Sequence, residues 1–314
     1  MTLIPRLIAF ATAAALVGCA PADREPLVVD QDAQFVVLAS SSDGWGKDLV
    51  LLDSDGLETG RVATDISDAN DIAYHPDGFF VVSAADGMND GLYRVELDGT
   101  AREFGESGHD WFGVPFSEQR PYGVAVTNTG DVVVSEAEGG VSTYDADGEE
   151  ITTDNLDGAN GDANSCFMDT SIAVDGTTVS MDLYGPRVVV VGPDGSLGQL
   201  GDVFGQDLGL VSADAGGDWF AASFKDGDSL WQLPADGTEA VEVGRISDLA
   251  ADDTWAIDGM ETAGVDSVYL LTEGGAGSAI IEVDGEGIVV PFATGGDAHW
   301  TAFTRVHRIS AAAL

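Results

Sequence analysis

The chain has 314 residues, and its 55 Asp and Glu against 12 Lys and Arg give a formal net charge of −43 at pH 7. Such a charge repels phosphate backbones and anionic membrane surfaces, which excludes nucleic acid as a partner. Because 44% of the residues are hydrophobic, the acidity does not indicate disorder, and the chain can bury a sizeable core.

The first 20 residues have the pattern of a secretory signal rather than of a membrane-spanning helix. Arg6 supplies the positive charge, and residues 7–17 form an apolar run of about ten residues that is followed by small residues. That run is too short to cross a bilayer as a helix. It ends in the sequence Leu16-Val17-Gly18-Cys19.

These four residues resemble the lipobox of bacterial lipoproteins. The resemblance implies cleavage after residues 1–18, with lipid on the Cys19 thiol and on the new amino terminus. Residues 19–33 then form a short polar tether, and lipid is the expected membrane attachment. Ala20 stands where an Asp tends to retain lipoproteins at the inner membrane. It therefore favours the outer membrane of a two-membrane bacterium, with the mature domain facing the periplasm or the outside. An ordinary signal peptide with an incidental cysteine is the alternative.

An Asp-Gly turn recurs along the mature chain, with its glycines spaced 43, 49, 47, 42 and 48 residues apart. A repeat in the forties with several strands in each unit is typical of a β-propeller. A short β-rich run precedes each turn, and Asp-Gly is expected to supply the positive φ of a hairpin. The six glycines are Gly56, Gly99, Gly148, Gly195, Gly237 and Gly285.

Three strands of each repeat unit can be located. Runs dense in Val, Phe and Ala are expected as second strands, which neighbouring blades bury on both faces. These runs are residues 35–39, 79–83, 132–135, 178–181, 219–223 and 267–272. Third strands follow at 48–52, 91–96, 140–144, 187–191, 229–233 and 279–283. Innermost strands begin at 71, 122, 169, 209 and 258, and the sixth is 299–304.

The sequence therefore predicts an all-β fold, a six-bladed β-propeller that forms one domain over residues 34–314. The N-terminal unit starts at its second strand, so the C-terminal strand is expected to complete the first blade and to close the ring without a disulfide. Cys166 is the only cysteine left after lipidation. We expect it to be a buried structural thiol rather than a nucleophile.

Two inner-strand phrases resemble those of NHL-repeat and gluconolactonase-like six-bladed propellers: Arg-Pro-Tyr-Gly-Val-Ala-Val at 120–126 and Asn-Asp-Ile-Ala-Tyr-His-Pro-Asp-Gly at 70–78. Gluconolactonase-like enzymes use a central metal, held by a carboxylate and asparagines, to activate water or to polarise a lactone carbonyl. The resemblance thus implies a metal-dependent hydrolase as one function. Asn70 is the only asparagine at the start of an inner strand, and the other family positions have no match.

Several carboxylates are expected around one mouth of the central channel. In such propellers the loop before each inner strand and the loop after each second strand share one face. Acids that converge there would hold a hard cation such as Ca²⁺ through oxygen ligands. Solvated, turn-forming acids that reflect a saline habitat are the alternative. Asp71, Asp169 and Asp258 lie at inner-strand starts, and Asp86, Glu136, Asp182 and Glu273 lie just after second strands.

Aromatic and histidine side chains fall on the same loops. Trp111, His109 and Trp300 are the candidates for ligand contact, since an indole beside carboxylates could hold a sugar ring, a peptide side chain or a cation. Trp300 and Trp255 could instead plug the space between blades. The four histidines, His299 among them, lack the paired spacing of a zinc centre. No Ser or Cys stands at a recognisable nucleophile spacing.

Two functions from different classes follow. The first is a non-enzymatic, lipid-anchored propeller that binds a ligand, an envelope protein or a glycan with its rigid face. It is favoured by the lipobox, the six-fold repeat and the lack of a complete catalytic constellation. The second is a Ca²⁺-dependent hydrolase of the gluconolactonase type. A third possibility is a calcium-stabilised structural element of the envelope, in which the Asx-rich residues 154–164 hold the ion rather than forming a flexible surface loop.

Overall fold

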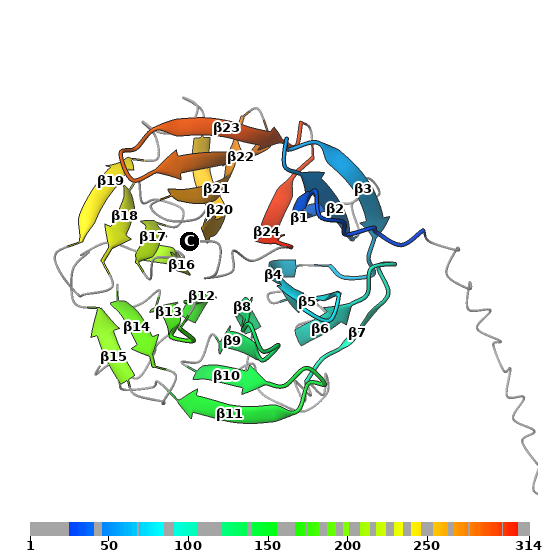
Figure 1. Ribbon diagram of the computed structural model, residues 1–314, viewed down its shortest axis with the longest axis horizontal. Helices are drawn as coiled ribbons and strands as arrows, with labels where there is room; N and C mark the ends of the chain where they lie inside the picture. Colours follow the sequence, from blue (N-terminus) through cyan, green and yellow to red (C-terminus); the bar gives the residue numbers. More distant parts are fainter. Residues whose placement is uncertain are drawn as a thin grey trace, which may run out of the picture.

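In the computed structural model, the described part of the chain is all β and forms a ring of six four-stranded antiparallel sheets (Figure 1). This arrangement confirms the predicted six-bladed β-propeller. The structure describes residues 25–40, 46–67, 69–84, 91–105, 121–136, 140–155, 167–173, 175–182, 187–192, 197–200, 208–213, 218–223, 229–234, 240–245, 254–262, 267–275, 277–296 and 298–306.

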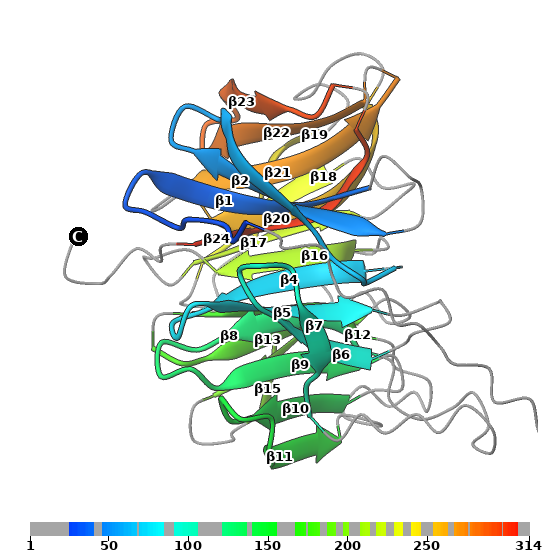
Figure 2. The same ribbon diagram turned by 90° about the vertical axis from the view of Figure 1, so that its right-hand side faces the viewer.

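Each blade runs from an innermost strand at the axis to an outermost strand at the rim, and Figure 2 shows the ring edge-on with the strands crossing its thickness. Blade 1 contains β24 (Trp300–Arg305), β1 (Ala33–Ser40), β2 (Lys47–Asp53) and β3 (Glu58–Ala63); blade 2 contains β4 (Ala69–His75), β5 (Phe79–Ala84), β6 (Gly91–Val95) and β7 (Ala101–Glu103). Blade 3 contains β8 (Pro121–Val126), β9 (Val132–Glu136), β10 (Gly140–Tyr144) and β11 (Glu150–Asn155); blade 4 contains β12 (Phe167–Ile172), β13 (Thr178–Asp182), β14 (Arg187–Val191) and β15 (Leu197–Leu200). Blade 5 contains β16 (Leu208–Ala213), β17 (Trp219–Ser223), β18 (Ser229–Leu233) and β19 (Val241–Arg245); blade 6 contains β20 (Thr254–Thr262), β21 (Ser267–Gly274), β22 (Gly277–Asp284) and β23 (Val289–Thr294).

The two ends of the chain close the ring within blade 1, as the sequence predicts. β24 pairs antiparallel with β1, so that Phe35 lies opposite Arg305 and Val37 opposite Phe303. The amide of Ser40 also donates to the carbonyl of His299 at 2.8 Å. The pairing covers the edge of β1 and supplies the innermost strand of blade 1.

The hydrophobic core lies between the blades, which explains why the second strands are continuously apolar. All six residues of β5 are buried, since this strand is covered on both faces. By contrast, the outermost strand β3 buries only Val62 and exposes most of its other residues. One cluster joins blade 1 to blade 6, where the ring of Phe35 meets that of Tyr269 edge-on with centroids 4.8 Å apart.

The turns between third and fourth strands require glycine at three of the predicted positions that the structure describes. Gly56, Gly99 and Gly148 have φ of 74°, 80° and 87°. The first two also press against the outer strand of the preceding blade. A Cβ on Gly56 would lie 2.1 Å from the carbonyl oxygen of Phe292, and one on Gly99 would lie 2.2 Å from that of Ala63. Any other residue is therefore excluded by both backbone conformation and space.

In blade 6 the positive φ falls on Gly287 (77°) rather than on the predicted Gly285, because the turn runs from Asp284 to Gly287 with the same spacing as the turn from Asp53 to Gly56. The amide of Gly287 donates to the carbonyl of Asp284 at 2.9 Å. The Asp284 Oδ1 accepts two further amides, from Glu286 and Ile288. Asp53 and Asp145 accept two amides in the same way in their own turns. Part of the acidity is thus built into the turns.

The folded region begins before Gln34. Within the predicted tether, Leu27 is 5% exposed, and its amide donates to the carbonyl of Leu97 in blade 2 at 2.8 Å. This contact places the start of the folded region at or before Leu27. Across the described ranges, no helix is long and apolar enough to cross a membrane. The predicted signal peptide and Cys19 lie outside the described residues.

Candidate functional site

Local irregularities in the inner strands direct three predicted aspartates toward the axis. In β4 the pairing with β5 skips one residue before Asp71, and in β12 the pairing with β13 skips one residue before Asp169. In β20 the skipped residue is Asp258 itself, between Ile257 and Gly259. Bulges of this kind re-aim a side chain relative to the regular pleat.

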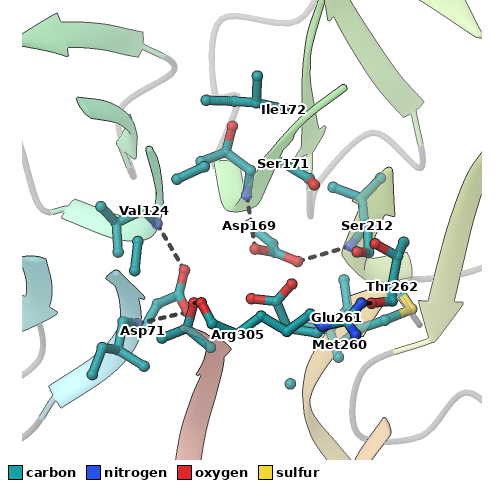
Figure 3. Close-up of a pocket in the computed structure, with 18 of the residues that line it drawn as sticks. Asp71, Val124, Asp169, Ser171, Ile172, Ser212, Met260, Glu261, Thr262 and Arg305 are labelled. Carbon is teal, nitrogen blue, oxygen red and sulfur yellow. Dashed lines mark hydrogen bonds between the residues drawn. The ribbon is translucent and has the colours of Figure 1, made fainter. Parts of the chain in front are cut away.

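Asp71 and Asp169 join neighbouring blades through backbone amides (Figure 3). The Asp71 Oδ1 accepts the amide of Ile72 at 2.8 Å, and its Oδ2 accepts that of Val124 in blade 3 at 2.7 Å. The Asp169 Oδ1 accepts the amide of Thr170 at 2.8 Å, and its Oδ2 accepts that of Val211 in blade 5 at 2.8 Å. Each carboxylate therefore links its own inner strand to the next one around the ring.

The two aspartates hold protons more tightly than ordinary carboxyl groups. Burial, with the nearby charge of Asp169, raises the pKa of Asp71 well above its usual value. Burial also raises the pKa of Asp169 to about 7, and the charge of Glu261 raises both. Four backbone amides act in the opposite direction, but desolvation and mutual repulsion outweigh them. The charge of Asp169 contributes to the raised pKa of Asp71, so the titrations of the two carboxyl groups are linked.

A polar cavity of about 150 Å³ lies along the axis between the inner strands. Figure 3 shows the carboxylates of Asp71, Asp169 and Glu261 directed into it from blades 2, 4 and 6. Arg305 also lines the cavity, and its Nη1 donates to the carbonyl of Thr262 at 2.9 Å. Four acids, with Asp258 as the fourth, thus face one basic side chain among the described residues of the lining.

A second cluster lies between blade 6 and blade 1, on the face of the ring where the inner strands begin. Asp258, Glu273 and His299 each offer one ligand atom, and these atoms all lie within 4.8 Å of one another. The His299 Nε2 is 2.9 Å from the Glu273 Oε1. Within the described ranges, no other group of three His, Cys, Asp or Glu comes this close. The structure thus brings together two predicted mouth carboxylates and a histidine whose spacing in the sequence shows no metal pattern.

The other predicted site residues have different surroundings. Glu136 is 5% exposed and accepts a hydrogen bond from the Ser142 hydroxyl at 2.7 Å, so it is a buried structural acid. Trp300 is 3% exposed and packs in the hydrophobic cluster between blades 1 and 6. Its ring therefore fills the space between blades, and this position does not support a ligand contact. Asp182 ends β13, opposite Phe167 in the pairing with β12. Asp86, His109, Trp111 and Cys166 lie outside the described residues.

Two lining residues were not anticipated from the sequence. Glu261 follows Asp258 in the same inner strand, and Arg305 ends the closing strand. Both lie near the ends of inner strands, whereas the residues expected from the sequence lie at the starts of inner strands or just after second strands. Only 12 of the 314 residues are Lys or Arg. An arginine at the end of a predicted inner strand is therefore notable, and this feature of the sequence could have indicated Arg305.

The comparisons with known proteins show the fold. No protein-family model and no curated protein matches the sequence. A protein of unknown function from Bacteroides caccae is similar in structure, with a TM-score of 0.61 and 13% identity over 88% of this chain and 100% of that chain. A catalytically inactive histidine-to-alanine variant of virginiamycin B lyase from Staphylococcus aureus, with quinupristin, gives a TM-score of 0.57 and 13% identity over 86% of this chain and 87% of that one. A chain of a nidogen–laminin complex gives 0.63 and 12% identity over 88% and 99%.

Proposed function

We propose that the protein is a lipid-anchored propeller of the cell envelope that binds a cationic group in its central channel. The observation that carries this proposal is that Asp71, Asp169 and Glu261, from alternate blades, line one cavity. The proposal is more specific than the ligand- or partner-binding platform expected from the sequence, because it states the charge of the bound group.

The electrostatics of the channel favour a cation over a neutral ligand. A raised carboxyl pKa means that the ionised form lacks enough compensating interaction in its surroundings. An ammonium or guanidinium group would replace the retained proton and would donate hydrogen bonds to the ionised carboxylates. The net charge of −43 also raises the concentration of cations around the whole molecule.

The size of the cavity limits what can enter. Its volume of about 150 Å³ is below the roughly 300–1,000 Å³ of a pocket that takes a drug-sized ligand. The channel therefore takes a group rather than a whole glycan. A small amine, or a lysine or arginine side chain presented by an envelope protein, has the required shape and charge.

The tether fits such a platform. Leu27 docks on blade 2 and stands only eight positions after Cys19. An extended chain of that length spans at most about 28 Å. A lipid on Cys19 would therefore hold the propeller close to the outer membrane and limit its orientations.

Calorimetric titration with a charged and an uncharged form of the same probe tests the proposal. Nα-acetyl-lysine amide is titrated into the full mature chain, and the matched control ligand carries an acetyl group on Nε. We expect binding of the charged form only, with release of protons that is measured by repeating the titration in buffers of different ionisation enthalpy. Asp169→Asn should weaken binding and reduce proton release, while Asp145→Asn, at an exposed turn, should change neither. Equal affinity for the two probes, or binding that Asp169→Asn leaves unchanged, would refute the proposal.

A metal-dependent hydrolase is the second candidate, because Asp71, Asp169 and Asp258 all line the one cavity at the axis. Ca²⁺ would be the metal on the gluconolactonase analogy, with the carboxylates as oxygen ligands. Metal content after purification, followed by lactone and ester hydrolysis with and without a chelator, distinguishes the two functions. A metal-free protein that is inactive on a broad panel, with and without added Ca²⁺, would eliminate the hydrolase.

A further inference from the structure

Asp258, Glu273 and His299 come from two blades that meet where the ring closes. Asp258 lies in β20 and Glu273 in β21, both in blade 6, whereas His299 directly precedes β24 of blade 1. Side-chain exposure is 45% for His299 and 23% for Glu273, so an ion can reach the cluster from solvent. Asp258 also lines the channel cavity, so the cluster adjoins the channel.

The backbone around His299 is fixed from both sides. The carbonyl of His299 accepts the amide of Ser40 in β1 at 2.8 Å. The amide of the next residue, Trp300, donates to the Ser278 hydroxyl of blade 6 at 2.9 Å, and this contact is buried. Ser278 in turn lies opposite Glu273 in the pairing of β21 with β22. The three side chains are thus carried on backbone that is already held in register, which lowers the cost of ordering a binding site.

From this geometry we propose that Asp258, Glu273 and His299 bind one divalent transition-metal ion of the Zn²⁺ class, which ties the closing strand β24 to blade 6. The choice of metal follows from the ligand atoms. An imidazole nitrogen with carboxylate oxygens suits Zn²⁺ and its neighbours, whereas Ca²⁺ takes six to eight oxygen ligands and Mg²⁺ near-ideal octahedral oxygen geometry. The site shares Asp258 and Glu273 with the calcium site expected from the sequence, but the imidazole of His299 favours a different metal.

The distances are compatible with one ion. Ligands around a tetrahedral Zn²⁺, at bond lengths of roughly 2.0–2.2 Å, lie about 3.4 Å from one another. The pair formed by His299 Nε2 and Glu273 Oε1 is already closer, at 2.9 Å, and no pair exceeds 4.8 Å. The ion would replace the proton between the imidazole and the carboxylate, and three protein ligands would leave a coordination position for water.

The test uses the full mature chain, stripped of metal with a chelator that is then removed. Zn²⁺ is titrated in the presence of a large excess of Ca²⁺, which saturates the many surface carboxylates. Stoichiometry, affinity and melting temperature are measured, and Co²⁺ is used as a spectroscopic substitute because its visible absorption reports coordination geometry. His299→Ala, Glu273→Gln and Asp258→Ala remove the proposed ligands one at a time. Glu286→Gln, which changes an exposed acid of the same blade, is the matched control.

We expect one Zn²⁺ per chain, a melting temperature that rises with Zn²⁺, and a low-symmetry Co²⁺ spectrum. Each ligand variant should bind Zn²⁺ about tenfold more weakly or worse and lose the rise in melting temperature, while Glu286→Gln behaves as the wild type. Zn²⁺ binding that Ca²⁺ displaces, or that His299→Ala leaves unchanged, would overturn the proposal. Since the lysine probe and Zn²⁺ are measured separately, failure of this site is distinguishable from failure of the channel site.

Discussion

Asp169→Asn should make the protein less stable than the wild type at acidic pH, and equally or more stable at alkaline pH. The wild-type carboxyl has a pKa of about 7 in the folded protein against 3.8 for the ordinary group. Between those values the folded state binds more protons than the unfolded state, so stability falls as the pH rises through this window. A rise of this size corresponds to a loss of at most roughly 4 kcal/mol from below pH 4 to above pH 7.

The substitution also removes one backbone hydrogen bond. Asp169 accepts amides from Thr170 and Val211, and an asparagine offers only one oxygen for the two. Leaving one buried amide without its acceptor costs roughly 1–3 kcal/mol at any pH. At about pH 4.5 the variant should therefore be less stable than the wild type, and at about pH 8 it should equal or exceed it, because only the wild type loses the proton-linked stability.

Urea unfolding at a series of pH values measures this difference directly, at a salt concentration that screens the surface acids. Asp145→Asn is the matched control, since Asp145 also accepts two amides but at an exposed turn. Both amides bind its Oδ1, an oxygen that asparagine retains, so this variant reports the effect of removing one charge at a turn. A stability difference between Asp169→Asn and the wild type that stays constant within about 0.5 kcal/mol from acidic to alkaline pH would refute a raised pKa.

Three further predictions concern the ring and the anchor. Gly99→Ala should destabilise the protein by about 2 kcal/mol or more in urea unfolding, because the Cβ meets both a positive φ and the Ala63 carbonyl. Gly78→Ala, with φ of 87° but nothing nearer than 4.0 Å, should cost only the backbone part, and equal losses would contradict the packing argument. Truncation before His299, which removes β24, should abolish cooperative unfolding, while truncation after Val306 should preserve it; calorimetry decides. Cys19→Ser should move the protein from the membrane to the soluble fraction in cell fractionation, and unchanged membrane association would reject lipidation.

The architecture of the ring could be predicted because the repeat is encoded locally. The apolar Val and Phe of the second strands and the turn glycines Gly56, Gly99 and Gly148 can be recognised within each repeat unit, although neighbouring blades supply part of the burial. The turn in blade 6 was misplaced because Asp284-Gly285 matches the Asp-Gly dipeptide, whereas the Asp-x-x-Gly spacing of the turns at Gly56 and Gly148 selects Gly287.

The site could be predicted only in part, because it depends on contacts between units. Asp71 and Asp169 were expected at the axis, and both line the cavity. The pairing of His299 with Glu273 joins residues 26 positions apart in different blades, and no spacing rule reports it. Glu261 and Arg305 reach the cavity from the strand ends, which depends on the length of each inner strand and on its bulges.

The most direct test of the account is a high-resolution crystal structure of the mature chain soaked with Nα-acetyl-lysine amide. The account predicts density for the ammonium group within hydrogen-bond distance of the carboxylates of Asp71, Asp169 and Glu261, with Arg305 displaced from it or turned away. A cavity that contains only water while the calorimetric binding persists, or an ammonium group bound elsewhere on the acidic surface, would contradict it.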